Sequence, residues 1–232
     1  SMFIKNGSYL ASFNLTSRKI PIKNECLNRL ILEELSYDAA KLAIESESLY
    51  HKLNDEQRNI YFEILGVVRA NKGGVFFFVS GHGGTGKTFL WNSVIAALRS
   101  EKQIVLVIAS YGVASLLLPG GRTGHSRFKI PLDVHEQSQC GISRSSMLAA
   151  LCQRACLILW DEAPMTHRCC FEALDRTLGD VLSAENEENR LLPFGRKIFL
   201  FGGDFRQILP GVEGGTREDI IGASLMSSPL WA

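Results

Sequence analysis

Long apolar runs are absent from the 232-residue sequence. A transmembrane helix needs about 20 consecutive, predominantly apolar residues. The longest apolar runs here, residues 75–79, 104–109 and 198–201, have the length of β-strands, so a membrane span is excluded. The first residues also lack the charged and then apolar pattern of a secretory signal peptide. We therefore expect an intracellular protein.

An excess of charge is also missing. The sequence has 25 Lys and Arg against 24 Asp and Glu, a formal net charge of +1. A strongly basic chain attracts nucleic acid through its overall charge, and this chain does not, so any nucleic-acid site must be local. With 46% hydrophobic and 21% charged residues, the composition is that of a globular protein. The length suits one large or two small domains.

The six cysteines lack the spacing of a zinc site. Structural zinc ligands usually come in C-x2-C pairs, whereas Cys152 and Cys156 are four residues apart in a helical pattern and Cys169 and Cys170 are adjacent. We therefore expect reduced, partly buried thiols.

Two amphipathic patterns, over residues 27–35 and 37–49, predict a small helical lead-in. Asn54 followed by Gln57 resembles a capping box that opens a further helix. From residue 75 on, short apolar runs alternate with helical patterns. Because these runs are apolar throughout, they predict a parallel sheet buried on both faces and flanked by helices, an α/β fold. We divide the chain into residues 1–50, a tail and the lead-in, and residues 51–232, the main domain.

Residues 81–88, GHGGTGKT, match the phosphate-loop pattern G-x-x-x-x-G-K-[ST] between a predicted strand and a predicted helix. Glycines let backbone N–H groups wrap a phosphate, and the helix adds its positive N-terminus. A glycine-rich turn without a ligand is the alternative, and the strand-loop-helix context argues against it. The predicted nucleotide-binding residues are Gly81, Gly83, Gly84, Thr85, Gly86, Lys87 and Thr88.

Two acids, Asp161 and Glu162, end a buried apolar strand and are followed by Ala163 and Pro164. Charge at such a place is costly without a partner such as a metal ion. Asp161 is predicted to hold Mg²⁺ through water, and Glu162 to orient and deprotonate an attacking water molecule. Surface acids are the alternative. The Glu after the Asp favours an ATPase over a small-molecule kinase.

A third cluster, Asp204, Arg206 and Gln207, also follows a predicted strand. Neighbouring parallel strands end at the same edge of a sheet, so this cluster should share the crevice of the loop and the acids. Gln207 is predicted to sense the γ-phosphate, and Arg206 to pair with an acid or contact DNA. Taken alone, the segment could equally be a structural turn.

The order of these motifs resembles the superfamily-one helicases of the petite-integration-frequency type, the PIF helicases, particularly their branch in plants and Helitron transposons. The resemblance extends from about Asn24 to the last residue. It rests on residues 53–57 (LNDEQ, the adenine-recognising Q motif), 81–88, 109–115 (ASYGVAS), 124–128 (GHSRF), 161–165 (DEAPM) and 203–207 (GDFRQ), with the family's signature helix at 165–182.

The resemblance implies a RecA-like phosphate-loop domain and ATP-driven 5′-to-3′ translocation on single-stranded DNA with duplex unwinding, in repair, recombination or telomere maintenance. It implies ATP and Mg²⁺ as cofactors. In that family's pattern, Asn54 and Gln57 would bind adenine, while Lys87, Glu162 and Gln207 would be catalytic, and Thr88 and Asp161 would hold the metal. The capping role of Gln57 is compatible with adenine binding.

DNA contacts are implied for Ser110, Tyr111, Gly112, His125, Ser126, Arg127 and Phe128. The residues themselves lend support, because the basic residues Arg122, His125, Arg127 and Lys129 have Phe128 among them, a combination that follows phosphates and stacks bases. A solvated basic loop explains the same segment.

The family binds ATP between two RecA-like domains, and this sequence ends soon after its third motif. We therefore expect a chain that binds nucleotide, hydrolyses it slowly and does not unwind DNA alone, because a missing arginine finger can cost about 10³- to 10⁵-fold in rate. Expected partners are single-stranded DNA, DNA junctions and a second RecA-like domain, with no membrane, in a monomeric nuclear or mitochondrial protein. The alternatives are a nucleotide-switched binding module without turnover, and an ATPase or kinase unrelated to DNA.

Overall fold

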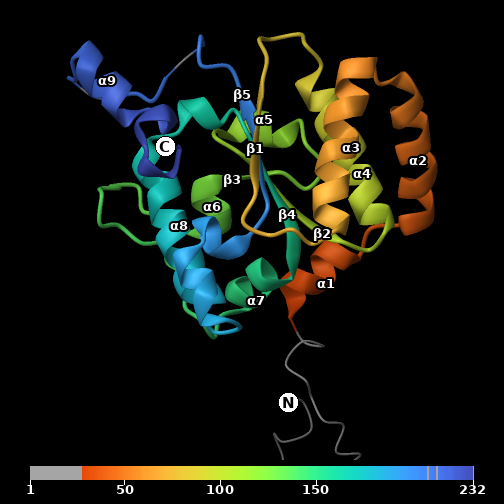
Figure 1. The fold of residues 1–232 in the computed structure, drawn as a ribbon, viewed down its shortest axis with the longest axis horizontal. Helices are drawn as coiled ribbons and strands as arrows, with labels where there is room; N and C mark the ends of the chain where they lie inside the picture. The colour runs from red at the N-terminus through yellow and green to blue at the C-terminus, as the bar shows by residue number, and fades with distance from the viewer. Residues whose placement is uncertain (1–27, 208, 213, 232) are drawn as a thin grey trace, which may run out of the picture.

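A computed structural model describes residues 28–207, 209–212 and 214–231 (Figure 1). Its centre is a five-stranded sheet with the order β1-β5-β4-β2-β3, in which every pair of neighbours is parallel. The strands are β1 (Phe76–Ser80), β2 (Ile104–Ala109), β3 (Arg122–Thr123), β4 (Ala155–Asp161) and β5 (Phe199–Gly203). The predicted α/β fold with a central parallel sheet is confirmed.

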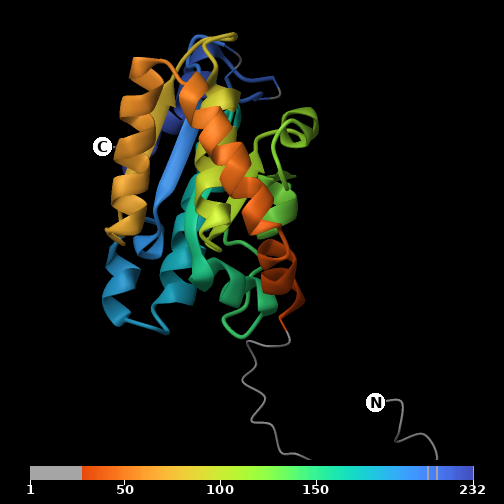
Figure 2. The ribbon, with the colours of Figure 1, turned by 90° about the vertical axis from the view of Figure 1, so that its right-hand side faces the viewer.

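Helices cover both faces of this sheet (Figures 1 and 2). The α-helices are α1 (Arg29–Leu35), α2 (Ala39–Lys52), α3 (Asp55–Arg69), α4 (Lys87–Ser100), α5 (Gly112–Leu116), α6 (Gly124–Phe128), α7 (Met147–Arg154), α8 (Arg168–Leu182) and α9 (Arg217–Ala223). Short 3-10 turns are η3 (Ala163–Met165), η4 (Glu187–Leu191), η5 (Pro193–Arg196), η6 (Leu225–Ser227) and η7 (Pro229–Trp231). The charged segment at residues 184–190 contains part of the 3-10 turn η4, and Asn189 in it is buried.

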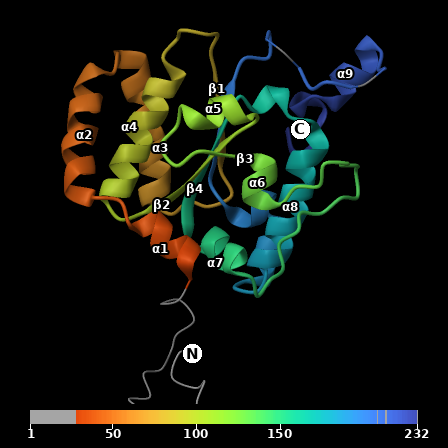
Figure 3. The ribbon, with the colours of Figure 1, turned by 180° about the vertical axis from the view of Figure 1, so that it is seen from behind.

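Alternate residues of the central strands enter two separate cores, because successive strand side chains point to opposite faces. One core combines α3 and α4 with Val105, Val107, Leu157, Leu159 and Leu200. The other combines α1, α6, α7 and α8 with Leu106, Ile108, Ile158, Trp160, Phe199 and Phe201. Both faces of β2, β4 and β5 are therefore covered, and Figure 3 shows the same arrangement from behind.

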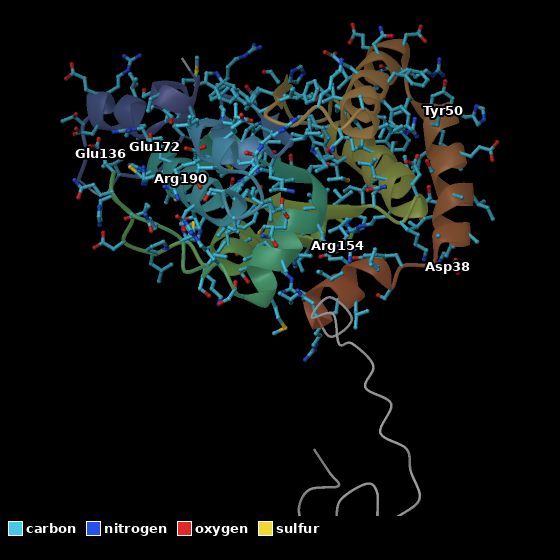
Figure 4. All side chains as sticks on the ribbon, turned by 60° about the horizontal axis from the view of Figure 1, so that its bottom comes forward. Asp38, Tyr50, Glu136, Arg154, Glu172 and Arg190 are labelled. Carbon is cyan, nitrogen blue, oxygen red and sulfur yellow. The ribbon has the colours of Figure 1, made fainter. Side chains whose placement is uncertain are left out.

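The helices begin at the polar residues expected of N-caps. Asn54 accepts a hydrogen bond from the Gln57 amide (2.8 Å), and the Gln57 side chain accepts one from the Asn54 amide (3.1 Å). This confirms the predicted capping box of α3. The Asp38 side chain caps α2 by accepting hydrogen bonds from the Ala40 and Lys41 amides, and Figure 4 shows Asp38 at one end of that helix with Tyr50 near the other.

The loop that precedes α7 is joined to α8 by ion pairs. Arg168, at the start of α8, contacts Glu136 of the loop (2.6 Å) and Glu172 of its own helix (2.8 Å). Figure 4 shows Glu136 and Glu172 close together at one side of the molecule.

None of the helices in the described part of the chain combines the length and apolarity of a bilayer-crossing segment.

A buried ion cluster attaches the helical lead-in to the main domain. Glu34 of α1 contacts Arg127 of α6 (2.8 Å) and Arg99 of α4 (3.3 Å), and all three side chains are at most 7% exposed. The Arg99 guanidinium also lies over the Tyr37 ring, 4.1 Å from its centroid. One carboxylate thus joins three helices across the predicted boundary at residue 50, which itself stays a prediction.

We predict that Glu34→Gln lowers the free energy of unfolding by about 3–5 kcal/mol, because removing one partner of a buried pair leaves charge uncompensated in the interior. Glu33→Gln is the matched control: Glu33 is half-exposed and pairs with Arg29 one turn away, an interaction that contributes about 0.3–0.5 kcal/mol. Urea unfolding measures both. Equal effects of the two substitutions would contradict a structural role for the buried cluster.

Candidate active site

The predicted phosphate loop lies between the end of β1 and the start of α4. Gly84 and Gly86 have φ of +87° and +82°, a left-handed backbone that glycine adopts without steric cost. Gly86 is the N-cap of α4, so the loop leads directly into the positive end of that helix. The Lys87 ammonium donates to the carbonyls of Gly81 and His82, which places its charge at the loop.

Gln57 connects the start of α3 to this loop. Its side-chain amide donates to the carbonyls of Thr85 (3.4 Å) and Gly86 (3.5 Å). A Cβ atom on Gly86 would lie 2.6 Å from that amide nitrogen, so the close approach requires glycine. The structure therefore brings the predicted adenine-binding residue and the phosphate loop together.

Asp161 ends β4 and is held from the neighbouring helix. Its Oδ1 accepts a hydrogen bond from the indole N–H of Trp91 (2.9 Å), and Asp161 is 6% exposed. Trp91 lies three residues after Thr88 on α4, and residues at this spacing share a helix face. Thr88 and Trp91, the partner of Asp161, therefore both lie near the start of α4.

A hard cation fits the oxygen donors of this place. Mg²⁺ prefers carboxylate and hydroxyl oxygens and keeps several water molecules, and the buried carboxylate of Asp161 supplies the negative charge. The described residues hold no group of three or more His, Cys, Asp or Glu side chains arranged around a metal. Any Mg²⁺ here would therefore take its remaining ligands from phosphate and water, as is usual for this ion.

Glu162 has an unusual backbone for a glutamate, with φ of 53° and ψ of 38°. Left-handed geometry costs energy in a residue with a Cβ atom and persists where the surroundings enforce it. Burial, and next to it the charge of Asp161, raises the pKa of the Glu162 carboxyl above its ordinary value. A raised pKa suits a general base that takes a proton from water.

The end of β5 meets the loop from its other side. The Gly81 amide donates to the Gly203 carbonyl (3.1 Å). A Cβ atom on Gly83 would lie 3.9 Å from the amide nitrogen of Gln207, so this side chain reaches the phosphate loop. Asp204 accepts a hydrogen bond from the Arg206 amide (2.9 Å), and Arg206 itself is exposed. The segment is thus a turn that also places the Gln207 side chain near the phosphate loop.

The residues expected to contact DNA divide into two groups. Tyr111 and Gly112 are exposed at the start of α5, and Ser126 is exposed on α6. His125 is half-buried, and burial lowers its pKa, which favours the neutral imidazole. The Ser110 hydroxyl, by contrast, points inward and donates to the Glu162 carbonyl (2.5 Å).

Two of the predicted DNA contacts are corrected by the structure. Phe128 is fully buried and stacks toward Trp160, so its ring is not offered to a base. Arg127 is buried against Glu34, because pairing offsets the cost of placing a guanidinium in the interior. The predicted basic surface is therefore reduced to Arg122 and Lys129, which are exposed, and the half-buried His125.

Three residues at the site were not predicted from the sequence: Trp91, Trp160 and Thr166. The local sequence pattern predicts a core or turn residue at each of these positions. The side-chain hydrogen bond that each residue makes joins it to a segment distant in the sequence. A signal for the tryptophans exists in hindsight, since a buried indole N–H needs an acceptor.

The cysteines in the described part of the chain, residues 140, 152, 156, 169 and 170, are free thiols. Burial raises the pKa of Cys152 to about 12 and that of Cys140 to about 11. Such thiols stay protonated and unreactive.

The family and the relatives to which this chain is similar are described as helicases. Residues 52–232 match the model of the family described as PIF1-like helicase. The ATP-dependent DNA helicase PIF4 of Trypanosoma brucei brucei (strain 927/4 GUTat10.1) is 30% identical over 173 residues, which are 72% of this chain and 19% of that protein. The ATP-dependent DNA helicase Pif1 of Psychrobacter sp. (strain PRwf-1) is 29% identical over 64% of this chain and 22% of its own length. The chain thus spans about a fifth of these relatives.

Solved structures share the fold. The Pif1 helicase from Bacteroides in complex with ADP-AlF3 and ssDNA has a TM-score of 0.60 and 24% identity, covering 77% of this chain and 39% of that one. The Pif1 helicase from Candida albicans has a TM-score of 0.56 and 25% identity, covering 77% and 37%. The RecA-like architecture expected from the motifs is confirmed.

We predict that Glu162→Gln raises the free energy of unfolding near neutral pH, because burial and Asp161 penalise the ionised carboxylate in the folded state. Folding raises this pKa, so the gain should shrink as the pH falls through the folded-state pKa and vanish below the ordinary carboxyl pKa, where the wild type is protonated in both states. Urea unfolding over a pH series measures the gain, with the exposed Glu47→Gln as control. A gain independent of pH would contradict the assignment.

Proposed function

Because this chain belongs to the PIF1-like helicase family, we propose that it is the ATP-binding motor domain of an ATP-dependent DNA helicase. One observation carries the proposal: the phosphate loop contacts Gln57 of α3, lies close to Gln207 after β5, and leads into α4, whose Trp91 binds Asp161. Four segments that are distant in the sequence thus meet around the phosphate loop.

The loop and the start of α4 would bind the phosphates of ATP. Backbone N–H groups and the helix N-terminus favour negative charge, and Lys87 would exchange its carbonyl partners for the β- and γ-phosphate oxygens. Gln207 would contact the γ-phosphate from the opposite side, and Gln57 with Asn54 would recognise adenine beside the loop. Mg²⁺, held by Thr88 and Asp161, would supply charge neutralisation at the phosphates.

Glu162 would act as the general base of ATP hydrolysis. Its raised pKa places the carboxylate closer to the range in which a base is both ionised and able to hold a proton. Glu162 directly follows Asp161, the last residue of β4, and has a left-handed backbone. The bond from Trp91 holds Asp161 and thereby separates the roles of the two adjacent acids.

Single-stranded DNA would follow the surface formed by the exposed Tyr111, Gly112 and Ser126 and the half-buried His125. An aromatic side chain beside exposed polar groups suits base stacking and phosphate contact, and Arg122 and Lys129 add local positive charge. From the motif resemblance, we extend the proposal to 5′-to-3′ translocation, unwinding at junctions, a second RecA-like domain as partner, and roles in repair, recombination or telomere maintenance of a nuclear or mitochondrial protein.

We predict that Lys87→Ala weakens ATP binding about 10- to 100-fold, because hydrogen bonds to charged groups contribute about 1.5–3 kcal/mol. Glu162→Gln should keep ATP binding and lower hydrolysis by about 10²- to 10⁴-fold, the contribution of a general base. Titration with a fluorescent ATP analogue and phosphate release with and without single-stranded DNA measure these effects.

Exposed Lys41→Ala and Glu47→Gln are the controls. Binding of ATP and of single-stranded DNA without any hydrolysis would favour the nucleotide-switched binding module. ATP hydrolysis that single-stranded DNA leaves unchanged would contradict the helicase assignment and favour an ATPase unrelated to DNA.

We predict that Gln57→Glu lowers the preference for ATP over GTP about fivefold, the effect of losing one hydrogen bond of about 1 kcal/mol. Glutamate keeps the side-chain oxygen that accepts from the Asn54 amide, so the capping box and the stability of α3 should persist. It lacks the amide donor now aimed at the loop. Competition titrations with ATP and GTP measure the preference. An unchanged ratio would leave Gln57 with the capping role alone.

A further inference from the structure

The Ser110 hydroxyl lies at a junction of three segments. It donates to the carbonyl of Glu162 (2.5 Å) and accepts hydrogen bonds from the Trp160 indole N–H (3.1 Å) and the Thr166 hydroxyl (2.7 Å). A serine hydroxyl has one donor and two acceptor positions, so its capacity is fully used. We call Ser110, Trp160 and Thr166 the Ser110 node.

The Ser110 node reaches the surface proposed for DNA by two routes. Along the chain, Ser110 is followed directly by Tyr111, which is 43% exposed at the start of α5. Through space, a Cβ atom on Gly124, the first residue of α6, would lie 2.5 Å from the Trp160 ring. Phe128 of the same helix stacks toward that ring, with centroids 6.3 Å apart. Both segments proposed to meet DNA thus rest on this node.

The other side of the node holds the proposed general base. Trp160 immediately precedes Asp161 and Glu162 on β4, and Ser110 also bonds to Asp161 through its backbone amide (3.2 Å). Glu162, which has a left-handed conformation, accepts the bond from Ser110 at its carbonyl and is the N-cap of the 3-10 turn η3, whose C-cap is Thr166. Ser110 thus contacts the backbone of both adjacent acids directly.

We propose that Ser110, Trp160 and Thr166 are positioning residues that couple the DNA surface to the nucleotide site, by transmitting a displacement of Tyr111 or α6 to the backbone of Glu162. The inference rests on the proposed function, since it needs both ligands to bind. Saturated hydrogen bonds in a close-packed interior favour discrete arrangements over gradual deformation. A small shift at the surface would therefore change which carbonyl accepts the hydrogen bond from the Ser110 hydroxyl. The nearby carbonyl of Asp161, 3.4 Å from its hydroxyl, is the alternative acceptor.

Coupling is measured as a ratio of affinities. The dissociation constant of a fluorescein-labelled oligothymidylate is determined for the 232-residue chain with and without saturating AMP-PNP and Mg²⁺. Couplings between sites typically change affinity about 5- to 150-fold, and we expect wild type to fall in this range. Reciprocity requires the oligonucleotide to change the affinity for AMP-PNP by the same factor.

Thr166→Val should reduce the coupling factor to within about twofold of one, while each ligand alone keeps its affinity. Thr166→Ser retains the hydroxyl and should retain the coupling, a distinction that a general loss of stability would not produce. Ser115→Ala is the matched control, because that buried hydroxyl donates to Gly112 of its own short helix and takes no part in the node. Its coupling should equal that of wild type.

A second readout follows Trp160 itself. In protein labelled with 5-fluorotryptophan, the fluorine resonance of Trp160 is assigned by its loss in Trp160→Phe. Both the oligonucleotide and AMP-PNP should shift this resonance, and together they should shift it non-additively.

The outcomes separate the inference from the function it rests on. Wild type that binds neither ligand contradicts the proposed function and the inference with it. Wild type that binds both and shows no coupling, or variants that keep full coupling, overturn the inference and leave the proposed function standing. Equal loss in Thr166→Ser and Thr166→Val, or in Ser115→Ala, would likewise overturn it.

Discussion

A parallel sheet whose two faces are both covered by helices is open to a ligand chiefly where its strands end. In this chain, the carboxyl ends of β1, β4 and β5 lie side by side, because the order β1-β5-β4 places them together. The phosphate loop directly follows β1 and the turn with Gln207 directly follows β5, while the two acids stand at the end of β4. Their convergence is therefore a consequence of strand order, and each polar cluster is brought to the site by the strand that precedes it.

Polar bonds across the interior then refine this arrangement. Trp91 connects the helix after the phosphate loop to Asp161, and Ser110 connects the end of β2 to Glu162. On the other side of the domain, Glu34 connects α1 to α4 and α6. Buried polar groups are costly when unpaired, so each of these contacts penalises alternative packings. The nucleotide helix α4 takes part in two of the three.

The buried cluster of Glu34, Arg99 and Arg127 also shows that a basic residue within a motif expected to bind DNA can have a structural role. Arg127 lies in a segment with Arg122, His125 and Lys129, and by composition it belongs with them. In the structure it neutralises Glu34, because its position on α6 faces α1 while Ser126 faces solvent. Phe128 follows the same logic: an aromatic residue between cations suggests stacking on bases, but its side of α6 faces Trp160.

Sequence alone determined those features that depend on local chemistry. The capping box at Asn54 and Gln57, the glycines of the phosphate loop and the apolar strands all follow from requirements of the residue and its near neighbours, and they are readable from spacing. Tertiary structure decided which side of the short helix α6 is buried. It also decided which carbonyl accepts the hydrogen bond from Ser110 and that Trp91 donates a hydrogen bond to Asp161. These contacts join residues about 50 to 90 positions apart, and no local pattern carries them, because their energy appears only when the segments pack.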